Sequence, residues 1–289
     1  MIPVIDNILG RFSQDLAIDL GTVNTLIHVQ GKGVAIYEPS IVAQHKKTKR
    51  IVAIGQEAKK MVGRTPANIM IVRPLRDGVI SDYDATLIML STFVRKIHKK
   101  PGGGFAIPRP KVVVAIPSQI TEVEKRALID VARTAGAREV FLVEEPLAAA
   151  MGSGMNVNEP CGLMICDIGG GTTEIAVISM GGIVVGRSLK IAGNTMDLDI
   201  AGYVRTRHSL SLGEKTREEV KILLGSAYPM KVEKEMVVRG SDLERGLPKS
   251  IKLSSVQIRE ALSGTISVIV QAVKDVVEDT PPELAADIS

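Results

Sequence analysis

The residues best suited to chemistry in this chain are an acid and three glycines that follow an apolar run. Leu163–Cys166 leads into Asp167, Gly169–Gly171 follow, and Thr172 opens a second apolar run. This order predicts a strand, a tight turn and a second strand. Glycine N–H groups can approach a phosphate closely because no Cβ intervenes. The carboxylate of Asp167 would instead hold a divalent cation, directly or through water.

A second stretch repeats the pattern 148 positions earlier in the chain. An apolar lead ends at Asp19, Gly21 follows, and the hydroxyl residues Thr22 and Thr25 precede another apolar run. One glycine-rich hairpin alone often does no more than reverse the chain. Two hairpins of the phosphate-binding type predict two similar half-molecules that face each other across a cleft, with a nucleotide between them.

These stretches resemble the actin-like ATPase superfamily, and the likeness to its bacterial MreB family runs along essentially the whole chain. The stretches that carry the resemblance are Asp19–Thr25, Arg73–Ile80, Gly136–Ala150, Asp167–Glu174 and Gly225–Pro229. The resemblance implies a duplicated, actin-like (ribonuclease H-like) α/β fold. Each of its two domains would hold a mixed sheet flanked by helices and a smaller inserted subdomain.

A pair of acids, Glu144 and Glu145, follows the predicted strand 139–143. Such acids can simply stabilise the start of the next helix. The resemblance assigns Glu145 as the catalytic glutamate, and Thr172 as the threonine that helps to orient the attacking water. Glu145 would accept a hydrogen bond from water in line with the γ-phosphate, and positioning would carry the rate. A weak, slow, Mg-dependent ATPase activity coupled to polymerisation is the expectation.

The resemblance and the hairpin pattern together give a set of expected nucleotide contacts, with ATP or ADP as the ligand. Asp19 and Asp167 are expected to hold Mg through water. The expected contact residues are Gly21, Thr22, Val23, Asn24, Gly169, Gly170, Gly171, Thr172, Gly193, Asn194, Glu218 and Lys221.

Two parts of that set have open alternatives. Glu218 and Lys221 lie three positions apart on a predicted helix, and their resemblance to an element that grips ribose and adenine competes with an ordinary surface ion pair between them. Asp197 is expected to cap the helix that starts near Gly193. Ala192 stands where family members often have glycine, which makes close phosphate approach there less favourable.

The composition excludes several other classes of protein. The chain has 289 residues, 45% hydrophobic and 24% charged, which is typical of a globular protein large enough for two domains. A formal charge of +4 and 3% aromatic residues give no nucleic-acid footprint, and the basic run 46–50 is interpreted as a solvated loop. Cys161 and Cys166 are expected to be buried, reduced thiols.

Hydrophobic periodicity predicts the elements that position these residues. Strands are expected at 33–42, 111–116, 139–143, 182–191, 231–238 and 250–253, and helices at 84–98, 121–136, 215–221 and 254–278, with a loop at 99–110. The run 111–116 is typical of a strand covered on both faces. Thr121 and Glu124 have capping-box spacing. The periodic helix 254–278 is expected to pack on the second sheet.

The first twelve residues would place Met1, Ile5, Ile8, Leu9 and Phe12 on one side of a helix. Such a segment could lie in a membrane surface, as in the MreB family, or pack on its own domain or fray. No apolar run approaches the roughly 20 residues that a spanning helix needs.

The domains are expected at residues 1–149, with an insertion near 34–82, and at 150–289, with an insertion near 187–250. The chain stops after the turn at 280–283, whereas the family continues with an adenosine motif and a return to the first domain. The sequence is either incomplete or a naturally shortened relative. A pocket that lacks one wall is expected to bind nucleotide weakly.

The resemblance implies a cytoplasmic protein, peripheral at the membrane, that polymerises into filaments. Its partners would be further copies of itself, the inner face of the cytoplasmic membrane, and membrane-embedded elongation and wall-synthesis proteins, with no nucleic acid. It would organise wall synthesis and maintain rod shape. The alternatives are a monomeric phosphotransferase of the sugar-kinase type and a non-hydrolysing structural remnant.

Overall fold

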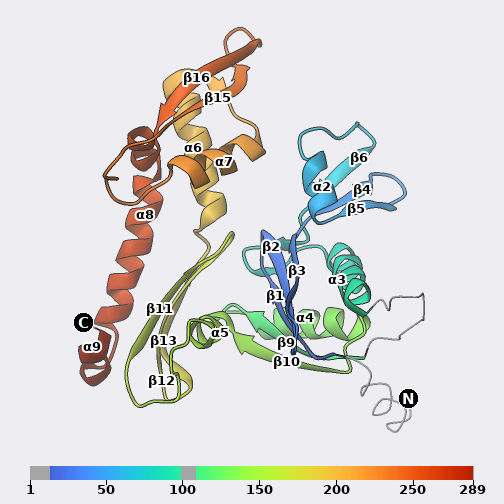
Figure 1. Cartoon of the computed structure of the whole chain (residues 1–289), viewed down its shortest axis with the longest axis vertical. Helices are drawn as coiled ribbons and strands as arrows, with labels where there is room; N and C mark the ends of the chain where they lie inside the picture. Colours follow the sequence, from blue (N-terminus) through green and yellow to red (C-terminus); the bar gives the residue numbers. More distant parts are fainter. Residues whose placement is uncertain (1–13, 99–108, 289) are drawn as a thin grey trace.

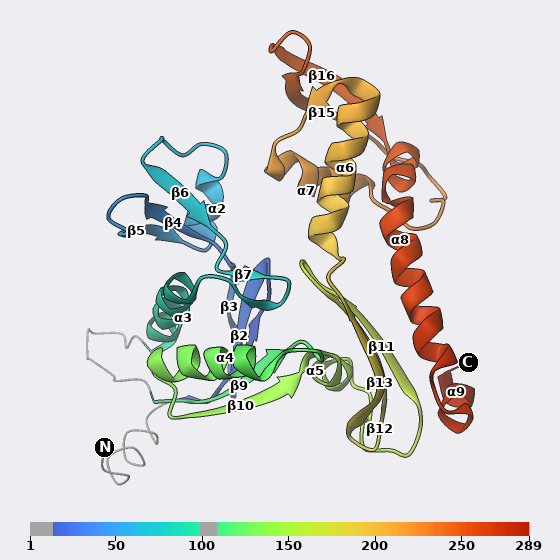
Figure 2. The same cartoon turned by 180° about the vertical axis from the view of Figure 1, so that it is seen from behind.

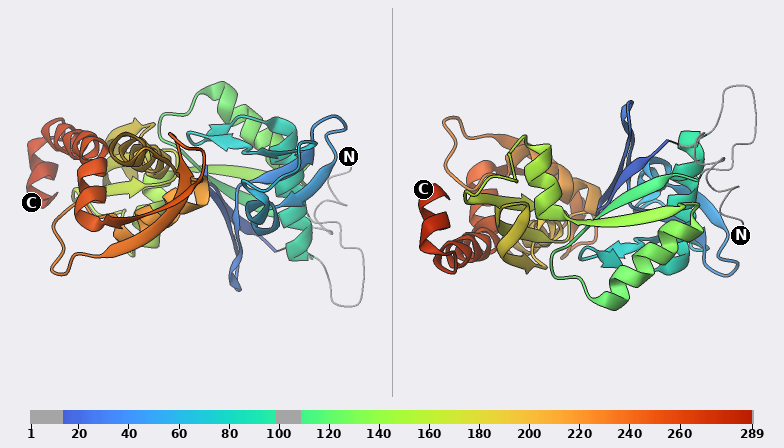
Figure 3. Two further views of the ribbon diagram at one scale, coloured as in Figure 1. Left: turned by 90° about the horizontal axis from the view of Figure 1, so that it is seen from above. Right: turned by 90° about the horizontal axis from the view of Figure 1, so that it is seen from below.

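The computed structural model describes residues 14–98 and 109–288. The amphipathic segment expected at 1–12 and most of the loop expected at 99–110 lie outside these residues. The chain forms two halves that stand side by side, each with a sheet at its base and a smaller arm above (Figure 1). The two end-on views place the halves on opposite sides of the molecule (Figure 3). The expected domain boundaries, at residues 1–149 and 150–289, stay a prediction.

The first half runs from the first described strand to the helix between the two bases. Its elements are β1 (Leu16–Leu20), β2 (Asn24–Val29), β3 (Gly33–Pro39), β4 (Val42–His45), β5 (Ile51–Ile54), α2 (Gln56–Met61), β6 (Ile69–Val72), β7 (Leu75–Arg76), β8 (Val79–Ile80), α3 (Tyr83–His98), β9 (Lys111–Ile116), α4 (Glu122–Thr134), β10 (Glu139–Glu144) and α5 (Glu145–Gly152).

The second half continues to the end of the described chain. Its elements are β11 (Leu163–Ile168), β12 (Thr173–Ser179), β13 (Gly182–Leu189), α6 (Gly193–His208), β14 (Leu210–Ser211), α7 (Glu214–Leu224), β15 (Glu235–Asp242), β16 (Pro248–Ser254), α8 (Ser255–Glu278) and α9 (Pro282–Ile288).

The base of the first half is a mixed five-stranded sheet in the order β10-β9-β1-β2-β3. β9 runs parallel to both β1 and β10, whereas β1, β2 and β3 form antiparallel hairpins. Residues alternate between the faces of each strand, and the residues on one face pack with α3 and α4 into a single core. Seen from behind, α3 and α4 lie next to each other at one side of the strands (Figure 2).

The other face of this sheet is only partly covered within residues 14–98 and 109–288. Val113 is 39% exposed and Phe141 is 50% exposed, and the two are paired in register on β9 and β10. The expectation that strand 111–116 is covered on both faces is therefore wrong for the described chain, because α3 and α4 both pack on the same side. An apolar sequence alone does not tell which face a neighbouring element will cover.

The arm above the first base is a small antiparallel sheet, β5-β4-β6, closed by α2. Ile41, Ala43 and Ala58 form its core and are almost fully buried. α2 of this arm carries Lys59 and Lys60, and their side chains face the other half. The expected insertion near 34–82 contains this arm, but β3 belongs to the base sheet.

The base of the second half is a three-stranded sheet, β11-β12-β13, between two helices. Ala150 of α5 packs on one face of β12 through Ala176 and Ile178. Ala272 and Val276 of α8 pack on the other face. The strands are all antiparallel, unlike the mixed sheet of the first half, because each follows its neighbour through a short hairpin and no parallel crossover joins them.

The arm above the second base packs α6, α7 and the hairpin β15-β16 around the first half of α8. α8 therefore contributes to two cores, with Ile258 and Leu262 in the arm and Ala272 and Val276 in the base. The predicted helix at 254–278 and its packing on the second sheet are confirmed. Ser254 caps it through a capping box with Gln257.

Two smaller predictions about this half are wrong. The strand expected at 231–238 is found at 235–242, because its pairing with the next strand sets the register, whereas the strand expected at 250–253 lies within 248–254. Cys166 is exposed and Cys161 is half-buried. The thiols were expected to be buried, but β11 is an edge strand, so one side of it faces solvent. Among the described residues no helix has both the length and the apolar character needed to cross a bilayer.

Gly264 lies in the middle of α8, where an added Cβ would meet nothing within 4 Å. Replacing Gly264 by alanine should therefore raise the free energy of unfolding by about 0.5–1 kcal/mol, because glycine loses more backbone entropy in a helix. Urea denaturation followed by circular dichroism measures the change. Gly225→Ala is the matched comparison and should destabilise, since its Cβ would lie 2.4 Å from the Lys221 carbonyl oxygen. A loss of stability in Gly264→Ala would contradict the assignment.

Candidate functional site

The two glycine hairpins meet between the halves. A Cβ built on Gly170 would lie 2.1 Å from Cγ2 of Val23, and a Cβ on Gly171 would lie 2.5 Å from Oγ1 of Thr22. Any larger residue at either position would push the turns apart. The glycines are therefore needed for the close approach of the two hairpins, in addition to any approach of a ligand.

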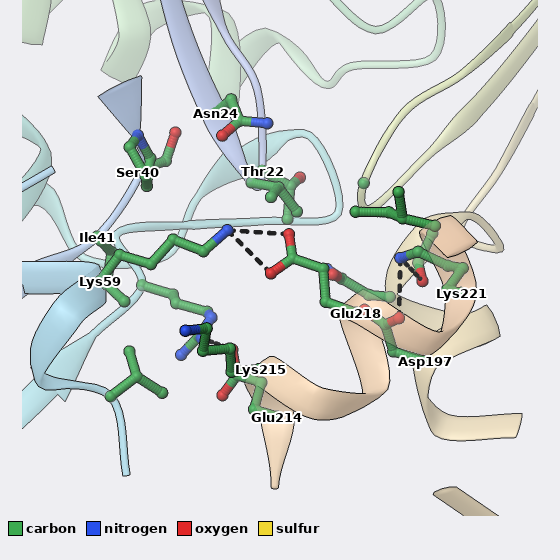
Figure 4. Close-up of a pocket in the computed structure, with 18 of the residues that line it drawn as sticks. Thr22, Asn24, Ser40, Ile41, Lys59, Asp197, Glu214, Lys215, Glu218 and Lys221 are labelled. Atoms are coloured by element: carbon green, nitrogen blue, oxygen red, sulfur yellow. Dashed lines mark hydrogen bonds and ion pairs between the residues drawn. The ribbon is translucent and has the colours of Figure 1, made fainter. Parts of the chain in front are cut away.

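A cleft of about 660 Å³ opens above this meeting point, between the two arms. It is lined from the first half and the second half alike, and Figure 4 shows several of the side chains that face it. The predicted contact residues among its lining are Thr22, Val23, Asn24, Gly169, Gly170, Gly193, Asn194, Glu218 and Lys221. Gly21, Gly171, Thr172, Asp19, Asp167 and Glu145 are outside the lining.

Local hydrogen bonds fix the first hairpin. The Gly78 N–H, in the turn between β7 and β8, donates to Oγ1 of Thr22 at 2.9 Å. Ser40 Oγ donates to the Gly21 carbonyl at 2.7 Å. Because the Thr22 oxygen accepts from Gly78, its own O–H is left to donate to another group. The family-like stretch 73–80 thus supports the first hairpin, a role that the sequence alone did not assign.

The second hairpin is joined to the start of α6. The N–H groups of Gly193 and Asn194 donate to the carbonyls of Gly169 and Gly170, at 3.1 and 2.8 Å. These two N–H groups therefore hold the turn to the helix in this conformation, and their contact with phosphate stays a prediction. The predicted cap is wrong: Ala192 is the N-cap residue, and Asp197 lies inside the helix, paired with Lys221 at 2.9 Å.

Four acids gather behind the hairpins, at the ends of strands from both halves. Burial raises the pKa of Asp19 to about 6, with a smaller contribution from Asp167. Burial also raises the pKa of Glu145 to about 8, helped by the charges of Asp19, Glu174 and Asp167. Burial raises the pKa of Asp167 as well. Asp19 and Asp167 therefore lie close enough to repel each other, as expected if both face one ligand.

Glu174 is an acid of this cluster that the sequence analysis did not single out. Its side chain is almost fully buried on β12, opposite Asp167. It accepts hydrogen bonds from the Ser118 N–H of the first half and from the Ser188 hydroxyl of the second half. Glu174 thus joins the two bases. The sequence could have indicated this role, because Glu174 lies in a predicted apolar strand and a buried acid there needs polar partners.

The residues present fit a hydrated magnesium ion. Among the described residues no group of three or more His, Cys, Asp or Glu side chains is placed to hold a metal directly. The pair Asp19 and Asp167, however, offers hard oxygen ligands, and a divalent cation would offset the repulsion that helps to raise the pKa of Asp19. This agrees with a site in which water completes the coordination.

Glu218 and Lys221 share one face of α7, but they do not pair with each other. Glu218 forms an ion pair with Lys59 from the opposite arm, at 2.9 Å. Lys221 pairs with Asp197 and donates to the Gly193 carbonyl at 2.8 Å. Figure 4 shows both sets of contacts. The alternative of a simple Glu218–Lys221 ion pair is therefore wrong.

The cleft also contains basic side chains that the sequence analysis did not predict. They are Lys59, Lys60, Arg64, Arg73 and Lys215. Arg73 forms an ion pair with Glu214 of the other half, and Arg73 begins one of the stretches that carry the resemblance. No periodic pattern marks the others, since they come from separate segments that only the folding of the two arms brings together.

Two halves with a duplicated hairpin-on-strand motif, meeting at the base of a cleft between two arms, define the actin-like class of two-domain α/β proteins. A family model described as MreB/Mbl protein matches residues 13–289. The chain belongs to the MreB/Mbl family.

Individual relatives agree with this assignment. The chain is 48% identical to the cell shape-determining protein MreB of Escherichia coli (strain K12), over 97% of this chain and 81% of that protein. It is 47% identical to the cell shape-determining protein Mbl of Bacillus subtilis (strain 168), over 96% and 82%. The crystal structure of MreB 5 of Spiroplasma citri bound to AMPPNP superposes with a TM-score of 0.89 at 42% identity, over 95% of this chain and 81% of that one.

Proposed function

We propose that this protein binds ATP with magnesium in the cleft, hydrolyses it slowly and assembles into filaments. The observation that carries the proposal is the meeting of the two glycine hairpins over the pair Asp19 and Asp167 at the base of the cleft. The similar MreB 5 structures of Spiroplasma citri, described as bound to AMPPNP and to ADP, support a nucleotide as the ligand.

The chain's own groups account for phosphate binding. The triphosphate would lie along the glycine turns, where backbone N–H groups can approach it without a Cβ in between. The Thr22 hydroxyl, which accepts from Gly78, would donate its proton to a phosphate oxygen. Asp19 and Asp167 would hold magnesium through water, and the ion would offset the charge of the phosphates.

Hydrolysis would depend on placing one water in line with the γ-phosphate. Glu145 begins α5 and belongs to the acid cluster, and its carboxylate would accept a hydrogen bond from that water and take up its proton during the attack. Thr172, which is 7% exposed and lies beside the Gly78 turn, would orient the same water. Because no covalent step on the protein is involved, the rate depends on how the two halves hold these groups together.

The biological role follows from relatives that are named cell shape-determining proteins. The filaments would lie at the inner face of the cytoplasmic membrane, meet membrane-embedded wall-synthesis proteins there, and maintain rod shape. The segment 1–12 would supply the membrane contact. Flotation of the protein with anionic vesicles, compared with a variant that begins at residue 13, tests that contact.

Sedimentation tests the central proposal. We expect the protein to pellet in the presence of Mg-ATP and to stay in the supernatant without nucleotide, while phosphate is released slowly. Hexose-dependent turnover by protein that remains in the supernatant would instead support a sugar-kinase type of phosphotransferase. Neither pelleting nor phosphate release under any nucleotide condition would contradict the proposed function.

A further inference from the structure

Two ion pairs join the arms across the upper part of the cleft. Nζ of Lys59, on α2, lies 2.9 Å from each carboxylate oxygen of Glu218, on α7. Arg73, at the end of β6, pairs with Glu214 at the start of α7. Figure 4 shows the Lys59 ammonium reaching over the cleft to Glu218. Both pairs connect segments more than 100 residues apart, so they exist only in this relative position of the arms.

Glu218 lies where its carboxylate could bind the ribose of a nucleotide. The glycine turns offer N–H groups at one end of the cleft, and Glu218 lines it together with Lys59 and Ile222 from the two arms. A carboxylate repels phosphate but can accept hydrogen bonds from the hydroxyls of a ribose. The Lys59 ammonium pairs with both carboxylate oxygens that would accept hydrogen bonds from these hydroxyls.

We propose that Lys59 competes with the nucleotide ribose for the carboxylate of Glu218, so that nucleotide binding exchanges an ion pair between the arms for a contact with the ligand. The inference rests on the proposed function and adds a mode of regulation to the same cleft. A bound ribose releases Lys59 from α7, so the state of the cleft and the contact between the arms are linked.

Because both side chains are partly exposed, opening the Lys59–Glu218 ion pair costs little free energy. Lys59 is 36% exposed and Glu218 is 29% exposed, so water can solvate both groups while the pair opens. Partly exposed ion pairs contribute little to the free energy of folding. Removing the competitor should therefore raise the affinity for a ribose nucleotide about two- to five-fold.

The test compares ADP with 2′,3′-dideoxy-ADP, which has the same phosphates and base but lacks both ribose hydroxyls. We expect Lys59→Met to bind ADP about two- to five-fold more tightly than the wild type and to leave the affinity for 2′,3′-dideoxy-ADP unchanged. Fluorescence titration or calorimetry on the full chain measures both constants. In the Glu218→Gln background, Lys59→Met should have no effect on either ligand.

Lys60→Met is the matched control. Lys60 lies on the same helix and lines the same cleft, but it pairs with Glu57 of its own helix. Its removal deletes the same charge without releasing Glu218. Because Lys60 is 62% exposed and pairs with Glu57, we expect the ratio of the affinities for the two ligands to stay as in the wild type.

The other outcomes overturn the inference. Weaker binding of both ligands by Lys59→Met would mean that Lys59 contacts the nucleotide itself. Equal gains for both ligands would mean that the variant only opens the cleft, and no change in either would mean that the pair is not in competition. If the wild type binds neither ligand, the proposed function fails first. If it binds ADP but Lys59→Met shows no selective gain, only the competition fails.

Discussion

Replacing Glu145 by glutamine is expected to lower the rate of phosphate release from Mg-ATP about 10²- to 10⁴-fold, because the amide cannot accept the proton of the attacking water. The affinity for ATP should change little, since Glu145 is outside the lining of the cleft. Because the fold raises the pKa of Glu145, its ionised form costs the folded state free energy at neutral pH, and the neutral amide should not lower the melting temperature. Single-turnover phosphate release, nucleotide titration and thermal denaturation measure the three quantities.

Glu144→Gln provides the matched control for this prediction. Glu144 is the N-cap residue of α5, yet its side chain makes no capping hydrogen bond. The substitution removes the same charge one residue away, and phosphate release should stay within a few-fold of the wild type. If Glu144→Gln abolishes release and Glu145→Gln does not, the assignment that the resemblance made between the two acids is wrong.

Ile258→Ala should produce the largest loss of stability from a single side chain that we predict. Ile258 is completely buried at the start of α8, in the core that joins α6, α7 and the β15-β16 hairpin. Truncating a buried isoleucine to alanine typically costs about 2–5 kcal/mol, as lost burial and a residual cavity. Urea denaturation should therefore show a free energy of unfolding lower by that amount, with the midpoint displaced to lower urea.

Val270→Ala, on the same helix, controls for effects on the helix itself. Val270 is 47% exposed, and alanine has the higher helix propensity, so its stability should change by less than about 1 kcal/mol. Similar losses in both variants would mean that α8 does not depend on the arm for its stability. A loss confined to Ile258→Ala would support α8 as the element that connects the arm with the base of the second half.

The charge of the cleft differs from what the whole chain suggests. The net charge is only +4 over 289 residues. The cleft, however, is lined by several Lys and Arg residues from both halves and by only three acids, Asp197, Glu214 and Glu218. A local excess of positive charge attracts a triphosphate and raises its rate of association. Each acid offsets the charge of the basic residue with which it pairs, so the positive excess within the lining comes from the other basic residues, Lys60, Arg64 and Lys215.

The local structure of the site was largely predictable from short-range pattern. Asp19 and Asp167 end predicted strands, and glycine and threonine follow each of them, so turn chemistry and alternation of apolar residues were enough to place both hairpins. The capping box at Thr121 and the periodic helix at 254–278 were also predicted, because caps and helical faces depend on residues three or four positions apart.

Other features depended on partners distant in sequence, and local pattern could not give them. The exposure of Cys166 depends on β11 being an edge strand, and the uncovered position of Val113 depends on both helices packing on one side of the sheet. Asp197 was expected to cap α6, but the helix begins at Gly193, so Asp197 lies inside it, where its carboxylate pairs with Lys221.

The sequence by itself determined the two hairpins, the acids at their strand ends and the family to which they belong. Only the tertiary structure decided that Lys59 holds Glu218, that Arg73 holds Glu214, and that Glu174 joins the two bases. The physical reason is the distance along the chain between the residues that interact. Turns, caps and amphipathic faces are set by neighbours along the chain, whereas an ion pair or a buried hydrogen bond between halves requires that the packing of each core first bring distant side chains within a few ångströms.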